Sequence, residues 1–195
     1  MAFVNLKPGT LLSPTPVVMV SCASSSQRPN IITVAWAGTV NSDPPMLSVS
    51  IRPDRHSHGI IRESGEFVVN LVSQRLLKAC DLCGVRSGRD QDKFALCELS
   101  PTPAAGLSTA PAISQAPAYL ACRVKDALDL GSHTMFLGEI ISMGVDEQLM
   151  DARGRIDFHK AELVAYRHGE YTGLTEPLGF FGFSVARPEV IRRRM

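Results

Sequence analysis

The feature that most constrains the fold is a succession of short apolar, β-branched runs, each bounded by turn-forming residues. In the run at residues 46–51, Leu47, Val49 and Ile51 alternate with polar serines, which is the period-2 pattern of a strand with two unlike faces. Similar runs predict strands at residues 17–22, 31–40, 66–72, 119–128 and 135–145. The polar corner at residues 129–134 joins the last two runs into a long antiparallel hairpin.

Helical patterns are fewer and shorter than the strand patterns. Residues 57–64 carry one apolar stripe and stop at Gly65, and residues 73–83 begin at the capping candidate Ser73. The stretch 100–117 is rich in Pro, Ala, Ser and Thr and predicts an extended surface connection. Many short strands with two inserted helices predict a mainly β fold, a Greek-key antiparallel or split β-barrel. A doubly wound α/β sheet is disfavoured, because the sequence has no G-x-G-x-x-G after a strand and no P-loop.

Composition limits the classes of function. With 195 residues, 45% hydrophobic and 20% charged, the chain suits a single domain over residues 1–195, with 164–195 as an extension packed on the barrel or on a partner copy. A formal net charge of +1 argues against a nucleic-acid-binding face. No apolar run reaches the roughly 20 residues of a membrane span or forms a signal-peptide core. Together with an odd number of cysteines, five, these features predict a cytoplasmic protein.

Two locally basic clusters could bind an anion such as a phosphate group. The first lies where a strand gives way to a helix, and the second contains a glycine that allows close backbone approach. The clusters comprise Arg52, Arg55, Ser57 and His58, and then Ser87, Gly88, Arg89 and Lys93. The alternative is that these charges solvate two loops, with Arg89 and Lys93 paired to Asp90 and Asp92.

Five sequence blocks, in order along the chain, resemble the flavin reductase-like family, to which the flavoredoxins belong. The blocks are residues 30–36 with 42–46, 51–57, 65–71, 87–94 and 133–140. The resemblance implies an FMN-binding split barrel that acts as a homodimer, with the flavin near the subunit interface. It also implies redox use of that flavin: members either reduce flavin with NAD(P)H or pass electrons to another protein, such as a partner oxygenase.

The resemblance also implies two sets of FMN contacts. The two basic clusters would bind the phosphate, and other residues would face the isoalloxazine ring. Candidates for the ring are Thr33, Val34, Ala35 and Trp36. The first three have small or β-branched side chains, which let a ring lie against the strand backbone. Asn70 is a further candidate, as a polar residue inside an apolar run. Two alternatives stay open: Trp36 could belong to the core, and Asn70 could pair with backbone groups.

His133 is the candidate catalytic residue. A histidine at this hairpin in the family can face the flavin or the incoming nicotinamide, where it orients substrate or stabilises developing charge. Here it follows Gly131 and Ser132, whereas many reductases have an acidic residue just before the histidine. The alternative is a solvated loop histidine, because hydride transfer between cofactors requires no side-chain acid or base.

The other reactive side chains predict neither a redox disulfide nor a metal site. Cys80 and Cys83 form a C-x-x-C motif late in a predicted helix, where the helix dipole does not stabilise a thiolate, so a structural, half-buried role is favoured. The five histidines are dispersed, and His56 and His58 are too close along the chain to converge easily on one ion. No nucleophile elbow is present either.

Three functions therefore compete. The first is an oxidoreductase, an NAD(P)H-dependent flavin or FMN reductase, and this one is favoured. The second is a flavoredoxin-type electron-transfer protein that serves a protein partner without efficient NAD(P)H turnover. The third is a flavin-free barrel that binds another phosphorylated ligand. No motif distinguishes NADH from NADPH, because the chain has no Gly-rich dinucleotide-binding turn.

Overall fold

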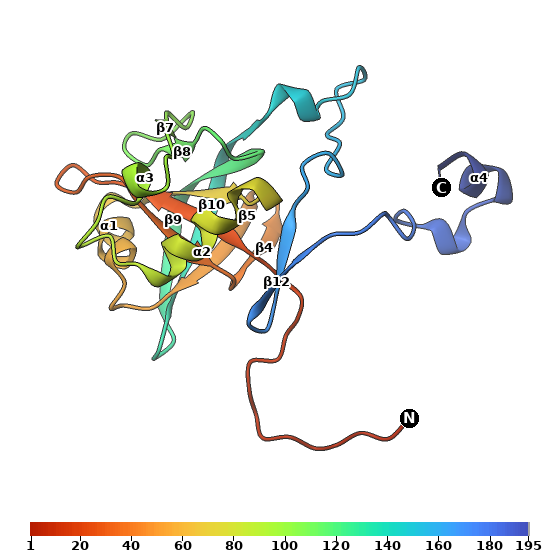
Figure 1. The fold of residues 1–195 in the computed structure, drawn as a ribbon, viewed down its shortest axis with the longest axis horizontal. Helices are drawn as coiled ribbons and strands as arrows, with labels where there is room; N and C mark the ends of the chain where they lie inside the picture. The colour runs from red at the N-terminus through yellow and green to blue at the C-terminus, as the bar shows by residue number, and fades with distance from the viewer. Residues whose placement is uncertain (195) are drawn as a thin grey trace.

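The computed structural model describes residues 1–194, and a curled antiparallel sheet forms its centre (Figure 1). Its strands are β1 (Thr15–Pro16), β2 (Val18–Cys22), β3 (Asn30–Val34), β4 (Ala37–Ser42), β5 (Pro45–Ile51), β6 (Glu66–Leu71), β7 (Pro101–Thr102), β8 (Ala112–Ile113), β9 (Ala118–Asp129), β10 (Thr134–Val145), β11 (Val164–Arg167) and β12 (Glu170–Gly173). Its helices are α1 (His56–Ser64), α2 (Leu77–Val85), α3 (Lys93–Leu96) and α4 (Pro188–Arg194), with 3-10 turns η1 (Gln74–Leu76), η2 (Glu147–Leu149) and η3 (Phe183–Val185).

The central sheet has seven strands in the order β3-β2-β6-β9-β10-β5-β4. β3 and β4 follow each other in the chain, yet they form the two opposite edges of this sheet. The sheet therefore curls into a barrel that is split between these two edges, which confirms the predicted fold class. The chain passes from one edge to the other through Ala35 and Trp36.

Most of the predicted strands are confirmed, and the exception lies at the split. The run at 31–40 was predicted as one strand, but it breaks at Ala35 and Trp36 into β3 and β4. The Trp36 carbonyl accepts a hydrogen bond of 2.9 Å from the Ser50 amide of β5, so the break stays tied to the sheet. The second predicted helix is also corrected, because Ser73 gives no side-chain cap and a 3-10 turn precedes α2.

Apolar residues pack on both faces of the sheet. Val18, Val20 and Cys22 of β2 point into the barrel with Phe67 and Phe136, while Met19 packs outside against α2. β2 is therefore buried on both faces, which explains why its sequence reads as a continuous apolar run and not as an alternation. The cluster under α2 fixes that helix against β3, next to the split.

The stretch 100–117, predicted as a surface connection, is partly built into the fold. Ala104, Ala110 and Ala112 are buried against Val68 and Ala121. The buried Glu66 carboxylate accepts hydrogen bonds from the amides of Ser108, Thr109 and Ala110 and from the Thr109 hydroxyl, at 2.8–3.4 Å. The negative charge of Glu66 on β6 thus anchors a loop that lies about 40 residues away along the chain.

Both ends of the chain lie outside the barrel (Figure 1). The β11–β12 hairpin pairs with β1 and rests on α2, where the Tyr171 hydroxyl donates to Asp81 at 3.0 Å. Beyond it the chain carries exposed apolar side chains, among them Leu178 and Phe181. No helix within residues 1–194 combines the length and the apolar character needed to cross a membrane.

Candidate functional site

The two basic clusters predicted from the sequence meet at one pocket beside α1. The pocket has a volume of about 150 Å³. It is lined by Asn30, Ile32, Asp54, Arg55, His56, Ser57, Cys83, Gly84, Arg86, Ser87, Gly88, Arg89 and Lys93. Four of these side chains are cationic and only one is a carboxylate, so the lining carries an excess of three positive charges. Such a pocket suits an anion.

The start of α1 contributes to this preference. Arg55 is its N-cap residue, and no side chain caps the helix there. The first turn contains no acidic residue. Because the first amides of an α-helix have no acceptor within it, they and the helix dipole favour an anion at this end.

Three residues from distant segments shape the wall of the pocket. The Asn30 amide donates to the buried Ser57 hydroxyl at 2.8 Å, which joins β3 to α1. The loop at 86–89 then packs on Asn30: a Cβ atom added to Gly88 would lie 2.1 Å from Asn30 Oδ1. Gly88 thus permits a close approach, as predicted, although the group it approaches in the structure is Asn30.

Lys93 is the least exposed cation of the site. Only 4% of it is exposed, and its ammonium donates to the carbonyls of Ile31 and Cys83 at 2.7 and 2.8 Å. None of the ion pairs among residues 1–194 involves Lys93. Burial lowers the pKa of this ammonium, the nearby thiol of Cys83 raises it, and Arg55 lowers it further. A buried charge held only by carbonyl dipoles would be stabilised by an anion in the pocket.

His56 reports on the same positive potential. Burial lowers its pKa, and the charges of Arg89, Lys93 and Arg28 lower it further. Arg89 is held in place by a 2.9 Å hydrogen bond from its guanidinium to the Asp54 carbonyl. These effects favour the neutral form of His56, and an anion bound nearby would raise its pKa again.

His58, predicted with the first basic cluster, does not line this pocket. Its imidazole Nε2 lies 2.9 Å from Thr134 Oγ1, and its ring meets the edge of Phe136. Thr134 in turn donates to Asp129, which pairs with Arg62 at 2.6 Å. Neighbouring residues on a helix point about 100° apart, so Ser57 faces the pocket while His58 faces the β9–β10 hairpin.

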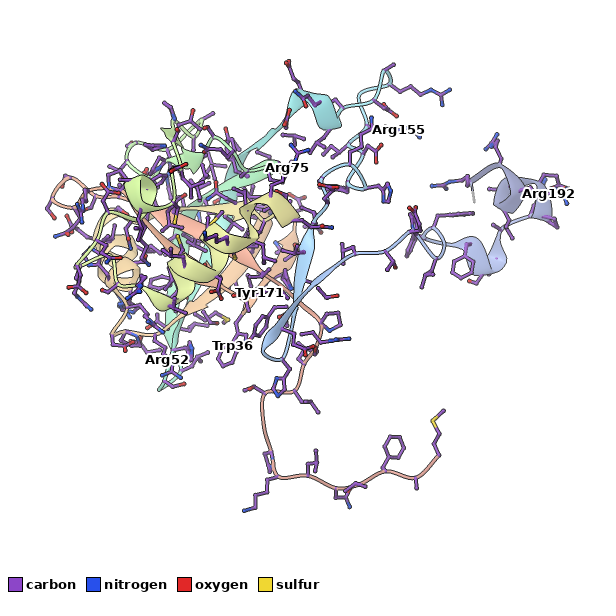
Figure 2. All side chains as sticks on the ribbon, in the orientation of Figure 1. Trp36, Arg52, Arg75, Arg155, Tyr171 and Arg192 are labelled. Atoms are coloured by element: carbon purple, nitrogen blue, oxygen red, sulfur yellow. The ribbon has the colours of Figure 1, made fainter. Side chains whose placement is uncertain are left out.

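Arg52 also lies outside the pocket lining and belongs to a second group at the split. Figure 2 shows it at the same end of the barrel as Trp36. The Trp36 ring packs on the His133 imidazole with 4.6 Å between centroids. Burial and the charge of Arg52 lower the pKa of His133, while Asp54 raises it. Trp36 is 45% exposed, so it is not a core residue and offers an open aromatic surface.

The predicted ring contacts Thr33, Val34 and Asn70 have side chains that already pack or form hydrogen bonds within the protein. The Thr33 hydroxyl donates to the Cys80 carbonyl of α2, and Val34 is buried inside the barrel. The Val34 side chain is therefore turned away from a ring outside the barrel, while its backbone could meet one. Asn70 is fully buried, donates to the Met19 carbonyl at 2.9 Å and accepts from the Ile113 amide at 2.8 Å. Its amide joins three segments of the interior, which corresponds to the backbone-pairing alternative.

Several lining residues were not among the candidate binding residues predicted from the sequence. Asn30, Asp54, His56, Gly84 and Arg86 line the pocket beside the predicted residues. Asn30, Asp54 and His56 fall inside the sequence blocks that carry the family resemblance, and this was the available signal. Gly84 and Arg86 lie outside them, and only the packing of α2 on β3 brings them to the site. No metal-binding group of three or more side chains occurs within residues 1–194.

Comparison with known proteins decides the family. The family described as "Flavin reductase like domain" matches residues 11–175 of this sequence. The chain belongs to that family. The match covers the barrel and the residues that line the pocket. It therefore confirms the family resemblance that the sequence blocks indicated.

Individual members of the flavin reductase-like family are similar to this chain in both structure and sequence. The flavoredoxin of Desulfovibrio vulgaris (Miyazaki F) superposes with a TM-score of 0.88 at 30% identity, over 95% of this chain and 100% of that one. The flavin reductase (NADH) of Kitasatospora aureofaciens is 30% identical over 67% of this chain and 66% of its own length. The reductase component of the FADH(2)-dependent resorcinol hydroxylase of Rhizobium sp. (strain MTP-10005) is 28% identical over 68% and 72%.

Proposed function

We propose that this chain is an oxidoreductase that binds FMN and reduces it with NAD(P)H. The observation that carries the proposal is the anion pocket, whose lining includes the buried Lys93 and the start of α1 and carries an excess of positive charge. A pocket of about 150 Å³ is smaller than the roughly 300–1,000 Å³ that encloses a whole small ligand. It suits the phosphate of a larger molecule whose remainder lies outside it.

The phosphate of FMN fits the donors that line this pocket. Arg55 and Arg89 supply guanidinium groups, Ser57 and Ser87 supply hydroxyls, and α1 supplies backbone amides. FMN carries close to two negative charges at neutral pH, which would balance most of the positive excess. Arg52 and His58 are left out of this set, because they lie outside the pocket lining.

The isoalloxazine ring is assigned to the split between β3 and β4. Ala35 and Trp36 cross this opening, and Trp36 and His133 form the exposed aromatic surface beside it. When bound, FMN supplies the hydride-accepting chemistry. His133 would position the nicotinamide against it by a hydrogen bond, as a neutral imidazole, because burial and Arg52 lower its pKa.

The reduced flavin would pass its electrons to a partner oxygenase or another acceptor protein. The name of the Rhizobium relative, a reductase component of a hydroxylase, supports this assignment. A second candidate function is electron transfer of the flavoredoxin type without efficient NAD(P)H turnover. The flavoredoxin of D. vulgaris, at a TM-score of 0.88, gives that alternative weaker support than the relatives named as reductases give the first. Five free cysteines support a reducing, cytoplasmic compartment in either case.

One titration series tests the proposal and separates the two candidates. The purified protein is mixed with FMN, and binding is followed by the visible spectrum and by quenching of flavin fluorescence. NADH or NADPH is then added under anaerobic conditions. Rapid bleaching of the flavin by NADH or NADPH supports the reductase. Bleaching only by a chemical reductant supports the electron-transfer protein. Failure to bind FMN at all would contradict both.

A further inference from the structure

The structure brings together a pair of thiols that the sequence motif does not predict. The C-x-x-C motif pairs Cys80 with Cys83, and both are free and buried in α2. The thiol of Cys83 instead lies 3.8 Å from that of Cys97, which ends α3. This distance is a van der Waals contact between sulfur atoms, so little movement separates the two thiols from a covalent bond.

The two thiols differ in access. Cys83 has no exposed surface, whereas Cys97 is partly exposed and lines a groove outside the barrel together with Arg75 and Lys78. Burial raises the pKa of Cys83 to about 12, and the neighbouring Cys97 raises it as well. Cys83 is therefore protonated and shielded, and Cys97 is the thiol that an oxidant from solution can reach.

Cys83 also belongs to the wall of the anion pocket. Cys83 and Gly84 both line it, and the Cys83 carbonyl accepts one of the hydrogen bonds of the buried Lys93 ammonium. Gly84 packs on Thr33 so closely that an added Cβ would lie 3.3 Å from the Thr33 Cβ. A displacement at Cys83 is thus transmitted to the cation that the pocket depends on.

We propose that Cys83 and Cys97 are a modification site, where hydrogen peroxide forms a reversible disulfide that weakens anion binding in the adjacent pocket. The Cys97 sulfur attacks peroxide, the O–O bond breaks, and a sulfenic acid and water form. The Cys83 sulfur then attacks that sulfenic sulfur, the S–O bond breaks, and the Cys83 proton leaves with the hydroxyl as a second water. Two thiols are oxidised and one peroxide is reduced.

The bond would change the pocket through the end of α2. The two sulfur atoms must approach from 3.8 Å to about 2.05 Å, which draws Cys83 toward α3 and shifts the carbonyl that holds Lys93. This consequence rests on the proposed function, because the phosphate of FMN is the anion concerned. A reduced flavin that reacts with oxygen generates hydrogen peroxide, so the oxidant arises where the flavin is used.

The first experiment tests the bond itself. The protein is treated with hydrogen peroxide, free thiols are alkylated, and the peptides are mapped by mass spectrometry. We expect a peptide pair joined through Cys83 and Cys97, lighter by two hydrogen atoms and separated by dithiothreitol. The Cys80→Ser variant should form the same link, and Cys97→Ser should form none. A bond between Cys80 and Cys83, or no disulfide, would overturn the proposal.

The second experiment tests the effect on the pocket. FMN affinity is measured for reduced, oxidised and re-reduced protein, and oxidation should weaken it by at least about fivefold, reversibly. The affinity of Cys97→Ser should not respond to peroxide. An equal affinity in the linked and reduced forms would contradict the coupling. A reduced protein that binds no FMN would instead refute the proposed function, and peptide mapping would still decide whether the bond forms.

Discussion

The contribution of a single side chain of the anion pocket to FMN affinity can be tested at Arg55. It occupies the N-cap position of α1 and lines the pocket, and the first helical turn contains no acidic residue. Replacing Arg55 with Ala should weaken FMN binding by about 1–3 kcal/mol, because a charge-assisted hydrogen bond to the phosphate is lost. Flavin fluorescence titration measures the change. Arg75→Ala is the matched control, since Arg75 lies in a different groove, and equal effects of both substitutions would remove Arg55 from the site.

Gly88 tests whether the pocket depends on close packing. An added Cβ would lie 2.1 Å from the Asn30 side chain, which is itself bonded to Ser57. Gly88→Ala should therefore displace the loop at 86–89 and weaken FMN binding at least about tenfold, roughly 1.4 kcal/mol. Gly59→Ala is the control in α1, where an added Cβ meets nothing within 4 Å. That substitution should leave FMN affinity unchanged and raise the free energy of unfolding by about 0.5–1 kcal/mol.

At the scale of elements, the anchor between β6 and the loop at 108–110 makes stability depend on pH. Burial raises the pKa of Glu66, but hydrogen bonds from Thr109, Ser108 and Ala110 outweigh it and lower the pKa below its usual 4.5. The charged form is therefore favoured in the folded state. Its contribution to stability is complete above the unfolded pKa and is lost as the pH falls through the lower, folded value.

Glu66→Gln isolates this contribution. At pH 7 the substitution should lower the free energy of unfolding by about 1–3 kcal/mol, because the charged acceptor of four donors is lost. The difference from the wild type should shrink as the pH falls from the usual 4.5 through the lower folded pKa, which urea unfolding measured at several pH values would reveal. Glu63→Gln provides the control on exposed surface. A difference that is constant with pH would mean that the anchor does not act through its charge.

The elements also mark how far sequence reasoning reaches. The period-2 pattern locates β5 because that strand buries one face, and apolar or β-branched runs locate β6 and the β9–β10 hairpin. The break at Trp36 carries no local turn signal, since it is imposed by the curl of the sheet. The basic loops were found because their charges are local, whereas Arg86 joins the pocket through the packing of α2 on β3. A pattern of charges does not fix which side of a helix each residue faces, so the sequence grouped His58 with Ser57 although its ring packs on Phe136.

At the scale of the whole molecule, the exposed apolar ends of the chain support the homodimer that the family resemblance implies. Leu178 and Phe181 are 88% and 106% exposed, although both are large and apolar. Burying such a side chain against a second copy would contribute about 1.5–3 kcal/mol each, which is enough to affect association strongly. The segment that carries them leaves the barrel after β12 and lies away from it (Figure 1).

We therefore expect the intact chain to be a dimer at micromolar concentration. In the double variant Leu178→Ser, Phe181→Ser, the dissociation constant of the dimer should rise at least about a hundredfold. Light scattering over a dilution series measures the mass of both proteins. Glu176→Ser, a polar change in the same exposed segment, should leave the dimer intact because it removes no apolar surface. If the flavin lies near the subunit interface, the double variant should also lose FMN as it dissociates, whereas the dimer at the same flavin concentration retains it.

A wild-type protein that stays monomeric at every concentration would contradict the dimer. A monomeric variant with full FMN affinity would place the whole flavin site within one subunit.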